Sequence, residues 1–117
     1  MRSALVSLVM LAGIGLPATV QGRDVMVWGA GQVSCGAWLE TRKVPEPPGD
    51  HRLEGRRQWL LGYLTAYEEY ARGGGDILNG SDADGAFAWV DNWCSQHPLE
   101  PIFRAGFALV SELSKHR

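Results

Sequence analysis

The chain has 117 residues, with 11 Lys or Arg against 13 Asp or Glu, which gives a formal net charge of −2. A nucleic-acid-binding surface needs a concentrated basic face, and the only local basic group is Arg52, Arg56 and Arg57, which is typical of a solvated helix face. Length and charge therefore indicate one small domain and argue against nucleic acid as a partner.

Residues 1–22 have the pattern of a secretion signal. A short basic start is followed by an apolar stretch from Ala4 to Leu16, which Pro17 ends, and small residues follow up to Gly22. The apolar stretch is shorter than the roughly 20 residues of a membrane-spanning helix, so we expect cleavage near Gly22. Residues 23–117 would then form a single small helical domain in the periplasm or outside the cell, without membrane association.

The first half of this domain is predicted to hold two helices. The segment Arg23–Gln32 is expected to be an extended lead-in ended by glycines, and Ser34 is a plausible N-cap for a short helix from Cys35 to about Lys43. The proline-rich segment Val44–Asp50 predicts a surface loop. Apolar residues at three- and four-residue steps then predict a second helix from about Leu53 to Arg72.

The second half is predicted to hold two more helices. Glycines end the second helix and continue as a loop, residues 73–80, after which Ser81 and Asp84 have the spacing of a capping box. The helix that follows must end before Pro98. A last helix is expected from Pro101, in its first turn, to about His116. Since no alternation typical of strands is present, we expect an all-α bundle of about four short helices.

The two cysteines, Cys35 and Cys94, are expected to form a disulfide. An even cysteine count in a short exported chain is typical of a disulfide, because the oxidising compartment lacks a reducing thiol pool. Such a bond would close a loop of about 60 residues and restrict the unfolded chain by roughly 4 kcal/mol. A catalytic thiol pair is the alternative, but redox enzymes place these cysteines two residues apart, a spacing this chain lacks.

Five tryptophans in so small a chain suggest either core packing or a binding platform. Core packing is favoured, because each Trp can bury on the order of 150 to 250 Å². Partner-binding candidates are Trp28, Trp89 and Trp93. Trp28 is the best of these, since its place in the lead-in gives it no obvious core face.

Metal, cofactor and catalytic signals are weak. The run from Gly80 to Asp91 resembles part of a calcium loop, with acidic residues at Asp82, Asp84 and Asp91, but its first position is glycine and the usual Glu is replaced by Asp. A capping box is the preferred interpretation. The histidines are scattered along the chain as His51, His97 and His116. We therefore expect no metal site, no cofactor and no catalytic residue.

Three stretches resemble small exported helical proteins of the HdeA type: Cys35–Leu39, Trp59–Leu64, and Cys94–Pro98 followed by Leu99 and Ala105. The resemblance implies an HdeA-like fold in which a cysteine of the first helix pairs with one just before a helix break at proline. It also implies a non-enzymatic periplasmic protein that binds unfolded clients, with acid loosening a dimer or the core to expose Trp and Leu surface. Whether this chain forms a homodimer stays open.

A related pattern is similar to immunity proteins of the Rap and Tai type in type VI secretion. The matching framework is Leu60, Gly62, Tyr63, His97, Pro98, Leu109 and Val110. This resemblance implies a protein that binds and neutralises a toxin, with the loops Val44–Arg52 and Gly73–Gly80 as recognition elements. A small exported hydrolase is the third alternative. The first two predict another protein as the partner.

Overall fold

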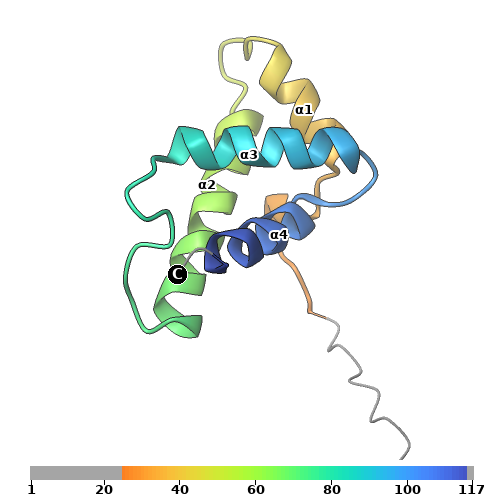
Figure 1. Cartoon of the computed structure of the whole chain (residues 1–117). Coiled ribbons are helices and arrows are strands. Elements are labelled where there is room, and N and C mark those ends of the chain that lie inside the picture. The colour runs from red at the N-terminus through yellow and green to blue at the C-terminus, as the bar shows by residue number, and fades with distance from the viewer. Residues whose placement is uncertain (1–24, 116–117) are drawn as a thin grey trace, which may run out of the picture.

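The structure is a computed structural model that describes residues 25–115. The predicted signal, residues 1–22, lies outside the described residues. Four α-helices form a bundle (Figure 1), preceded by one short 3₁₀ turn and with a π turn extending the second helix. The elements in order are η1 (Gly29–Gln32), α1 (Cys35–Lys43), α2 (Arg52–Ala66), η2 (Tyr67–Ala71), α3 (Ala83–Gln96) and α4 (Ile102–Ser114). The predicted all-α fold is confirmed.

The start of α1 follows the sequence prediction, and the segment before it does not. The Ser34 hydroxyl accepts a hydrogen bond from the Ala37 N–H at 3.2 Å, so Ser34 is the N-cap. The expected extended lead-in is wrong over η1, Gly29–Gln32, where the chain forms a 3₁₀ turn. Gly29 opens this turn with φ of 72°, a conformation that glycine adopts without a steric penalty.

The second helix ends before its glycines, as predicted, but its last turn is a π turn instead of an α-helical one. The α2 hydrogen-bond pattern stops at Ala66, and η2 continues the helix to Ala71. An ion pair between Glu68 and Arg72 lies in this turn, and the Gly74 N–H donates to the Glu68 carbonyl at 2.8 Å. The glycines that follow have positive φ, which ends the helix.

The predicted capping box at the start of α3 is wrong by one residue. The Ser81 N–H donates to the Leu78 carbonyl at 3.0 Å, so Ser81 belongs to the preceding turn. The cap is Asp82, whose carboxylate accepts from the Gly85 N–H at 2.8 Å. At the next junction α3 ends at Gln96, before Pro98 as predicted, and Pro101 is the N-cap of α4 rather than a residue of its first turn.

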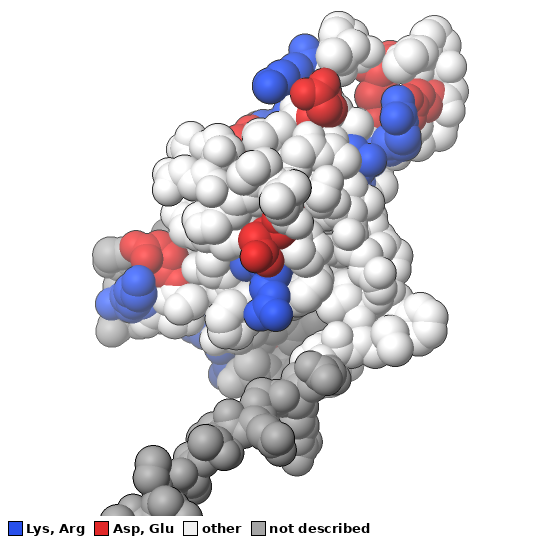
Figure 2. All heavy atoms as spheres, turned by 90° about the vertical axis from the view of Figure 1, so that its right-hand side faces the viewer, with Lys and Arg blue, Asp and Glu red and all other residues white. Residues whose placement is uncertain are grey.

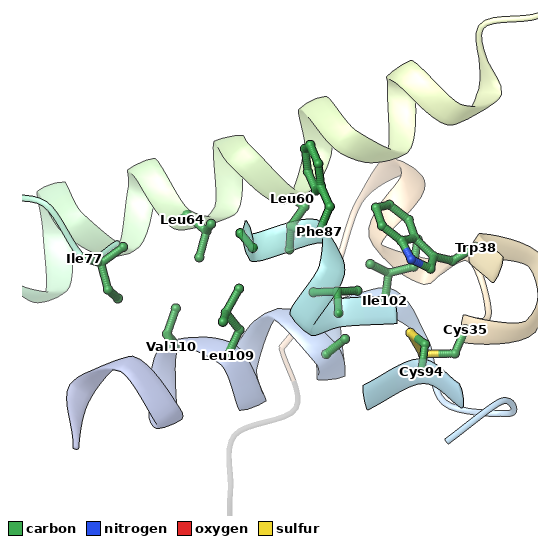
Figure 3. Packing of buried hydrophobic residues seen from close by; sticks show 13 residues of the cluster. Cys35, Trp38, Leu60, Leu64, Ile77, Phe87, Cys94, Ile102, Leu109 and Val110 are labelled. Atoms are coloured by element: carbon green, nitrogen blue, oxygen red, sulfur yellow. A yellow bond between two sulfur atoms is a disulfide. The ribbon is translucent and has the colours of Figure 1, made fainter. Parts of the chain in front are cut away.

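The core lies between the four helices, with the disulfide at one end of it (Figure 3). Cys35 of α1 and Cys94 of α3 are joined, with an S–S distance of 2.06 Å, and both are fully buried. The predicted pairing is confirmed. Besides the cysteines, the largest fully buried side chains are Trp38, Leu60, Ile102, Leu109 and Val90. Such a disulfide is consistent with an oxidising location outside the cytoplasm.

Backbone hydrogen bonds join the segment before α4 to the start of α1. The Cys35 N–H donates to the Glu100 carbonyl at 2.7 Å, and the Ile102 N–H donates to the Val33 carbonyl at 2.8 Å. The Gly36 N–H also donates to the Pro98 carbonyl at 2.9 Å. These bonds, together with the nearby disulfide, fix the position of α4 against α1.

Within residues 25–115, no helix is long and apolar enough to cross a bilayer.

Candidate functional site

The three candidate tryptophans occupy different environments. Trp28 is 77% exposed and follows the start of the described chain. Trp89 and Trp93 are partly buried on α3 and pack against the core. Trp93 also stacks on His97, with ring centroids 4.0 Å apart. The structure therefore leaves Trp28 as the most accessible aromatic candidate, and it groups Trp28 with Trp59 rather than with the two α3 tryptophans.

A groove of about 690 Å³ lies between the segment before η1, α2 and α4. Its walls are mainly apolar. The segment before η1 contributes Val25, Met26, Val27 and Trp28, α2 contributes Trp59 and Tyr63, and α4 contributes Phe103, Arg104 and Phe107. Phe107 is 61% exposed, and Val25 and Met26 are also largely exposed. We call this the apolar groove.

The composition and the size of the groove are both typical of a binding site. On the face that Figure 2 presents, charged side chains gather in a few groups, with a broad uncharged surface between them. Scattered single apolar residues are normal on a protein surface, whereas a hollow lined mainly by apolar and aromatic side chains is typical of a ligand site. The volume of the groove lies within the range typical of ligand pockets, about 300 to 1,000 Å³. The groove is therefore the candidate functional site.

Trp59, which lines the apolar groove, is fixed by contacts on several sides. Its indole N–H donates to the Trp28 carbonyl at 2.8 Å, and its ring stacks on Tyr63 with centroids 5.6 Å apart and planes at 14°. The indole ring also lies directly beside Gly31, which is buried. A Cβ at Gly31 would stand only 2.1 Å from a ring carbon of Trp59. Glycine is required at this position because any side chain would displace the indole.

We expect Gly31→Ala to lower the free energy of unfolding by about 1 to 3 kcal/mol, as overpacking does in a filled site. The matched control is Gly62→Ala on α2, where a Cβ meets no atom within 4 Å and where alanine should stabilise the helix by about 0.5 to 1 kcal/mol. Urea unfolding measures both variants. If Gly31→Ala is as stable as the wild type, the indole does not rest on Gly31 as described.

A second glycine, Gly106, lets α4 pack closely against α2. A Cβ at Gly106 of α4 would lie 3.1 Å from the Tyr63 ring of α2, so only glycine lets the two helices approach this closely without a shift of the ring. The resulting burial raises the pKa of the Tyr63 phenol above its usual value. Tyr63 is therefore neutral at physiological pH and contributes an uncharged wall to the groove.

The calcium interpretation of Asp82, Asp84 and Asp91 does not fit the structure. Asp82 caps α3, and Asp84 and Asp91 are separated along that helix. Asp91 is occupied: it accepts from the Trp38 indole N–H at 2.6 Å and forms a two-point ion pair with Arg42, with N–O distances of 2.8 and 3.0 Å. Within residues 25–115, no group of three or more His, Cys, Asp or Glu is placed to hold a metal ion.

The basic group of α2 is also not a simple solvated face, which corrects the sequence interpretation. Arg52 is exposed and pairs with Asp50, but Arg56 and Arg57 turn inward. The Arg56 guanidinium donates to the Ala37 carbonyl at 2.7 Å, and burial lowers its pKa from the ordinary value. Arg57 lies over the Phe87 ring, 5.3 Å from its centroid. Two of these arginines therefore join α2 to α1 and α3.

The described histidines do not form a site. The His97 Nδ1–H donates to the Trp93 carbonyl at 2.8 Å, which satisfies a carbonyl at the end of α3. His51 is exposed at the start of α2, and His116 lies outside the described residues.

Both loops proposed as recognition elements are held by internal contacts. In the first loop, hydrogen bonds from Arg52 hold the pKa of Asp50 at about 2, so this ion pair persists until the pH falls through that value. In the second loop, Ile77 is only 3% exposed and enters the core, a role the sequence interpretation missed. Asp76 accepts from the N–H groups of Leu78 and Gly80 at 3.0 and 2.8 Å. Each loop is therefore locally ordered.

No family model, curated protein or solved structure matches this chain. Over residues 25–115 the structure by itself defines the class: a small all-helical protein with four α-helices, one buried disulfide and an aromatic-lined surface groove.

Proposed function

We propose that this chain is a non-enzymatic periplasmic protein that binds other proteins through the apolar groove. The observation that carries the proposal is the exposure of Trp28 and Phe107, which line one groove from two different parts of the chain. Aromatic side chains dominate the binding energy of protein interfaces, and burying one contributes on the order of 1.5 to 3 kcal/mol. A partner that covers both walls would bury the most exposed apolar surface of the site.

The fixed positions of Trp59 and Tyr63 support binding, because they hold the groove in one shape. Trp59 is fixed by a hydrogen bond and by stacking, and Gly31 and Gly106 let it and Tyr63 pack without strain. A preformed site loses less conformational entropy when a partner binds. The lining residues within 25–115 offer binding surface rather than catalytic chemistry, since Tyr63 and Arg104 are the ionisable ones among them.

The periplasmic location is proposed on two grounds. The signal-like sequence of residues 1–22 would direct export, and the Cys35–Cys94 disulfide needs an oxidising compartment. These features agree with the resemblance to exported proteins of the HdeA type, in which the partners are unfolding clients.

In its chaperone form the protein would not require acid to open the groove. Among the described lining residues there is no Asp or Glu whose protonation could expose the groove. Since the groove is already open, we expect client binding at neutral pH as well as in acid.

The second candidate is an immunity protein that neutralises a toxin. It is favoured by the order of the Gly-rich loop, in which Ile77 is buried and Asp76 holds the turn, because an ordered loop suits one defined partner. Co-purification of a single partner at neutral pH would favour this candidate, whereas suppression of aggregation for unrelated clients would favour the chaperone.

The proposal is tested by the aggregation of an unfolding reporter enzyme, followed by light scattering with the oxidised mature protein at pH 7 and at pH about 2. The wild type should suppress scattering, and Trp28→Ala combined with Phe107→Ala should lose most of this effect, because the exposed aromatic walls are removed. The matched control is Tyr70→Ala, which truncates an aromatic side chain that is 82% exposed but lies outside the groove. Equal suppression by all three proteins would refute a binding role for the groove.

A further inference from the structure

We propose that the apolar groove selects protein segments that combine apolar side chains with a carboxylate, and that Arg104 determines this specificity. The inference rests on the proposed function and names the chemistry of the partner. Its occupant would be an extended or helical segment of another protein, with aromatic or aliphatic side chains flanking Glu, Asp or a terminal carboxylate.

Charge is the first argument. Among the lining residues within 25–115, Arg104 is the only Lys, Arg, Asp or Glu, so this part of the chain presents one positive charge in mainly apolar surroundings. Within residues 25–115, no carboxylate forms an ion pair with this side chain at 4 Å or less. A guanidinium beside apolar walls favours a carboxylate, with which it can form two parallel hydrogen bonds.

The position of the guanidinium is the second argument. It lies 5.1 Å from the centroid of the Phe103 ring, so stacking holds the charged group against a wall of the groove. An arginine held by stacking loses less conformational freedom on binding than one extended into water. The cation and the apolar walls therefore meet at one place, where a single short segment can contact both.

The same charge argues against a second copy of the chain as the occupant. In a two-fold symmetric contact between two grooves, each surface meets its own copy. Such a contact would place two Arg104 side chains in one mainly apolar interface, and the lining residues within 25–115 include no carboxylate to balance them. A partner that brings its own carboxylate satisfies the groove better.

The test uses short synthetic peptides rich in Leu and Phe with one central Glu, Gln or Lys. Their binding to the oxidised mature protein is measured by tryptophan fluorescence at low salt. We expect the Glu peptide to bind about fivefold more tightly than the Gln peptide, as a well-placed ion pair at a partly exposed site allows. The preference should shrink in high salt, because screening weakens charge pairs at the surface.

Arg104→Glu should reverse the order, so that the Lys peptide binds most tightly, while Arg104→Lys should retain a preference for Glu. The matched control is Lys43→Glu, which makes the same charge change at an exposed side chain of α1 outside the groove and should leave the order unchanged. Equal binding of the three peptides to the wild type, or an unchanged order in Arg104→Glu, would overturn the inference.

The proposed function and this inference fail in different ways. If the three peptides bind equally and Trp28→Ala with Phe107→Ala abolishes their binding, the groove binds protein but Arg104 does not select. If none of the peptides binds and sedimentation shows a dimer that the double variant dissociates, a second copy occupies the groove and the inference is wrong. Selective binding that requires both Arg104 and the aromatic walls supports it.

Discussion

Reduction of the Cys35–Cys94 disulfide is expected to lower the free energy of unfolding by about 4 kcal/mol. The two cysteines are 59 positions apart, so the bond closes a long loop and removes many conformations from the unfolded chain. It also joins α1 to α3 at the end of the core where backbone bonds hold the start of α4. A small domain has only about 5 to 15 kcal/mol in total, so much of its stability depends on this bond.

The measurement is urea unfolding of the oxidised and the reduced protein, followed by circular dichroism. Reduction keeps both sulfur atoms in the core, so it separates the loop constraint from the cavity that Cys35→Ala with Cys94→Ala would add. We expect the double alanine variant to be less stable than the reduced wild type. Equal stability of the oxidised and reduced forms would contradict the assignment of the disulfide as a main source of stability.

The helices and the disulfide could be predicted because their signals are local or chemical. Ser34 marks the start of α1, Pro98 limits α3, and the glycines after Arg72 end the second helix. The disulfide could be predicted from the even number of cysteines and the expected oxidising compartment. The errors lie at junctions, where two residues compete for one role: Asp82 rather than Ser81 caps α3, because the N–H of Ser81 is used in the preceding turn.

The apolar groove could not be predicted in the same way, because its walls come from three separate parts of the chain. The place of Trp28 in the lead-in, without an obvious core face, makes it a binding candidate from sequence alone, but the contact of Trp59 with Gly31 depends on how η1 packs against α2. Phe107 lies one helical turn after Phe103, and that spacing on α4 is the signal that could have revealed an outward aromatic strip. Arg104 lies between them in the sequence, but its proposed role depends on the apolar residues that surround it in the groove.

Asp91 is the clearest case of a residue whose role depends on distant partners. It lies 53 positions from Trp38 and 49 from Arg42, and its sequence context suggested only a calcium loop. In the structure its carboxylate joins α3 to α1 beside the core. The side chains of Arg42 and Asp91 are 22% and 27% exposed, so the pair is largely shielded from water.

Asp91→Ala is expected to lower the free energy of unfolding by about 2 to 3 kcal/mol, because it leaves two partners unsatisfied. The Trp38 indole N–H is fully buried and would lose its acceptor, and the Arg42 guanidinium would lose its counter-ion. Arg42→Met should be less damaging, since Asp91 would keep the hydrogen bond from Trp38 and the Met side chain could still pack beside Phe87.

A double-mutant cycle on Asp91→Ala and Arg42→Met, measured by urea unfolding, separates the ion pair from the indole hydrogen bond. Once Asp91 is alanine, removing the unpaired guanidinium should recover part of the lost stability, so the two changes should not add. The remaining loss should then reflect mainly the unsatisfied Trp38 N–H, and Trp38→Phe in the same background should recover part of it. Strictly additive losses would mean that Asp91 and Arg42 do not interact, so that their ion pair contributes nothing to holding α1 against α3.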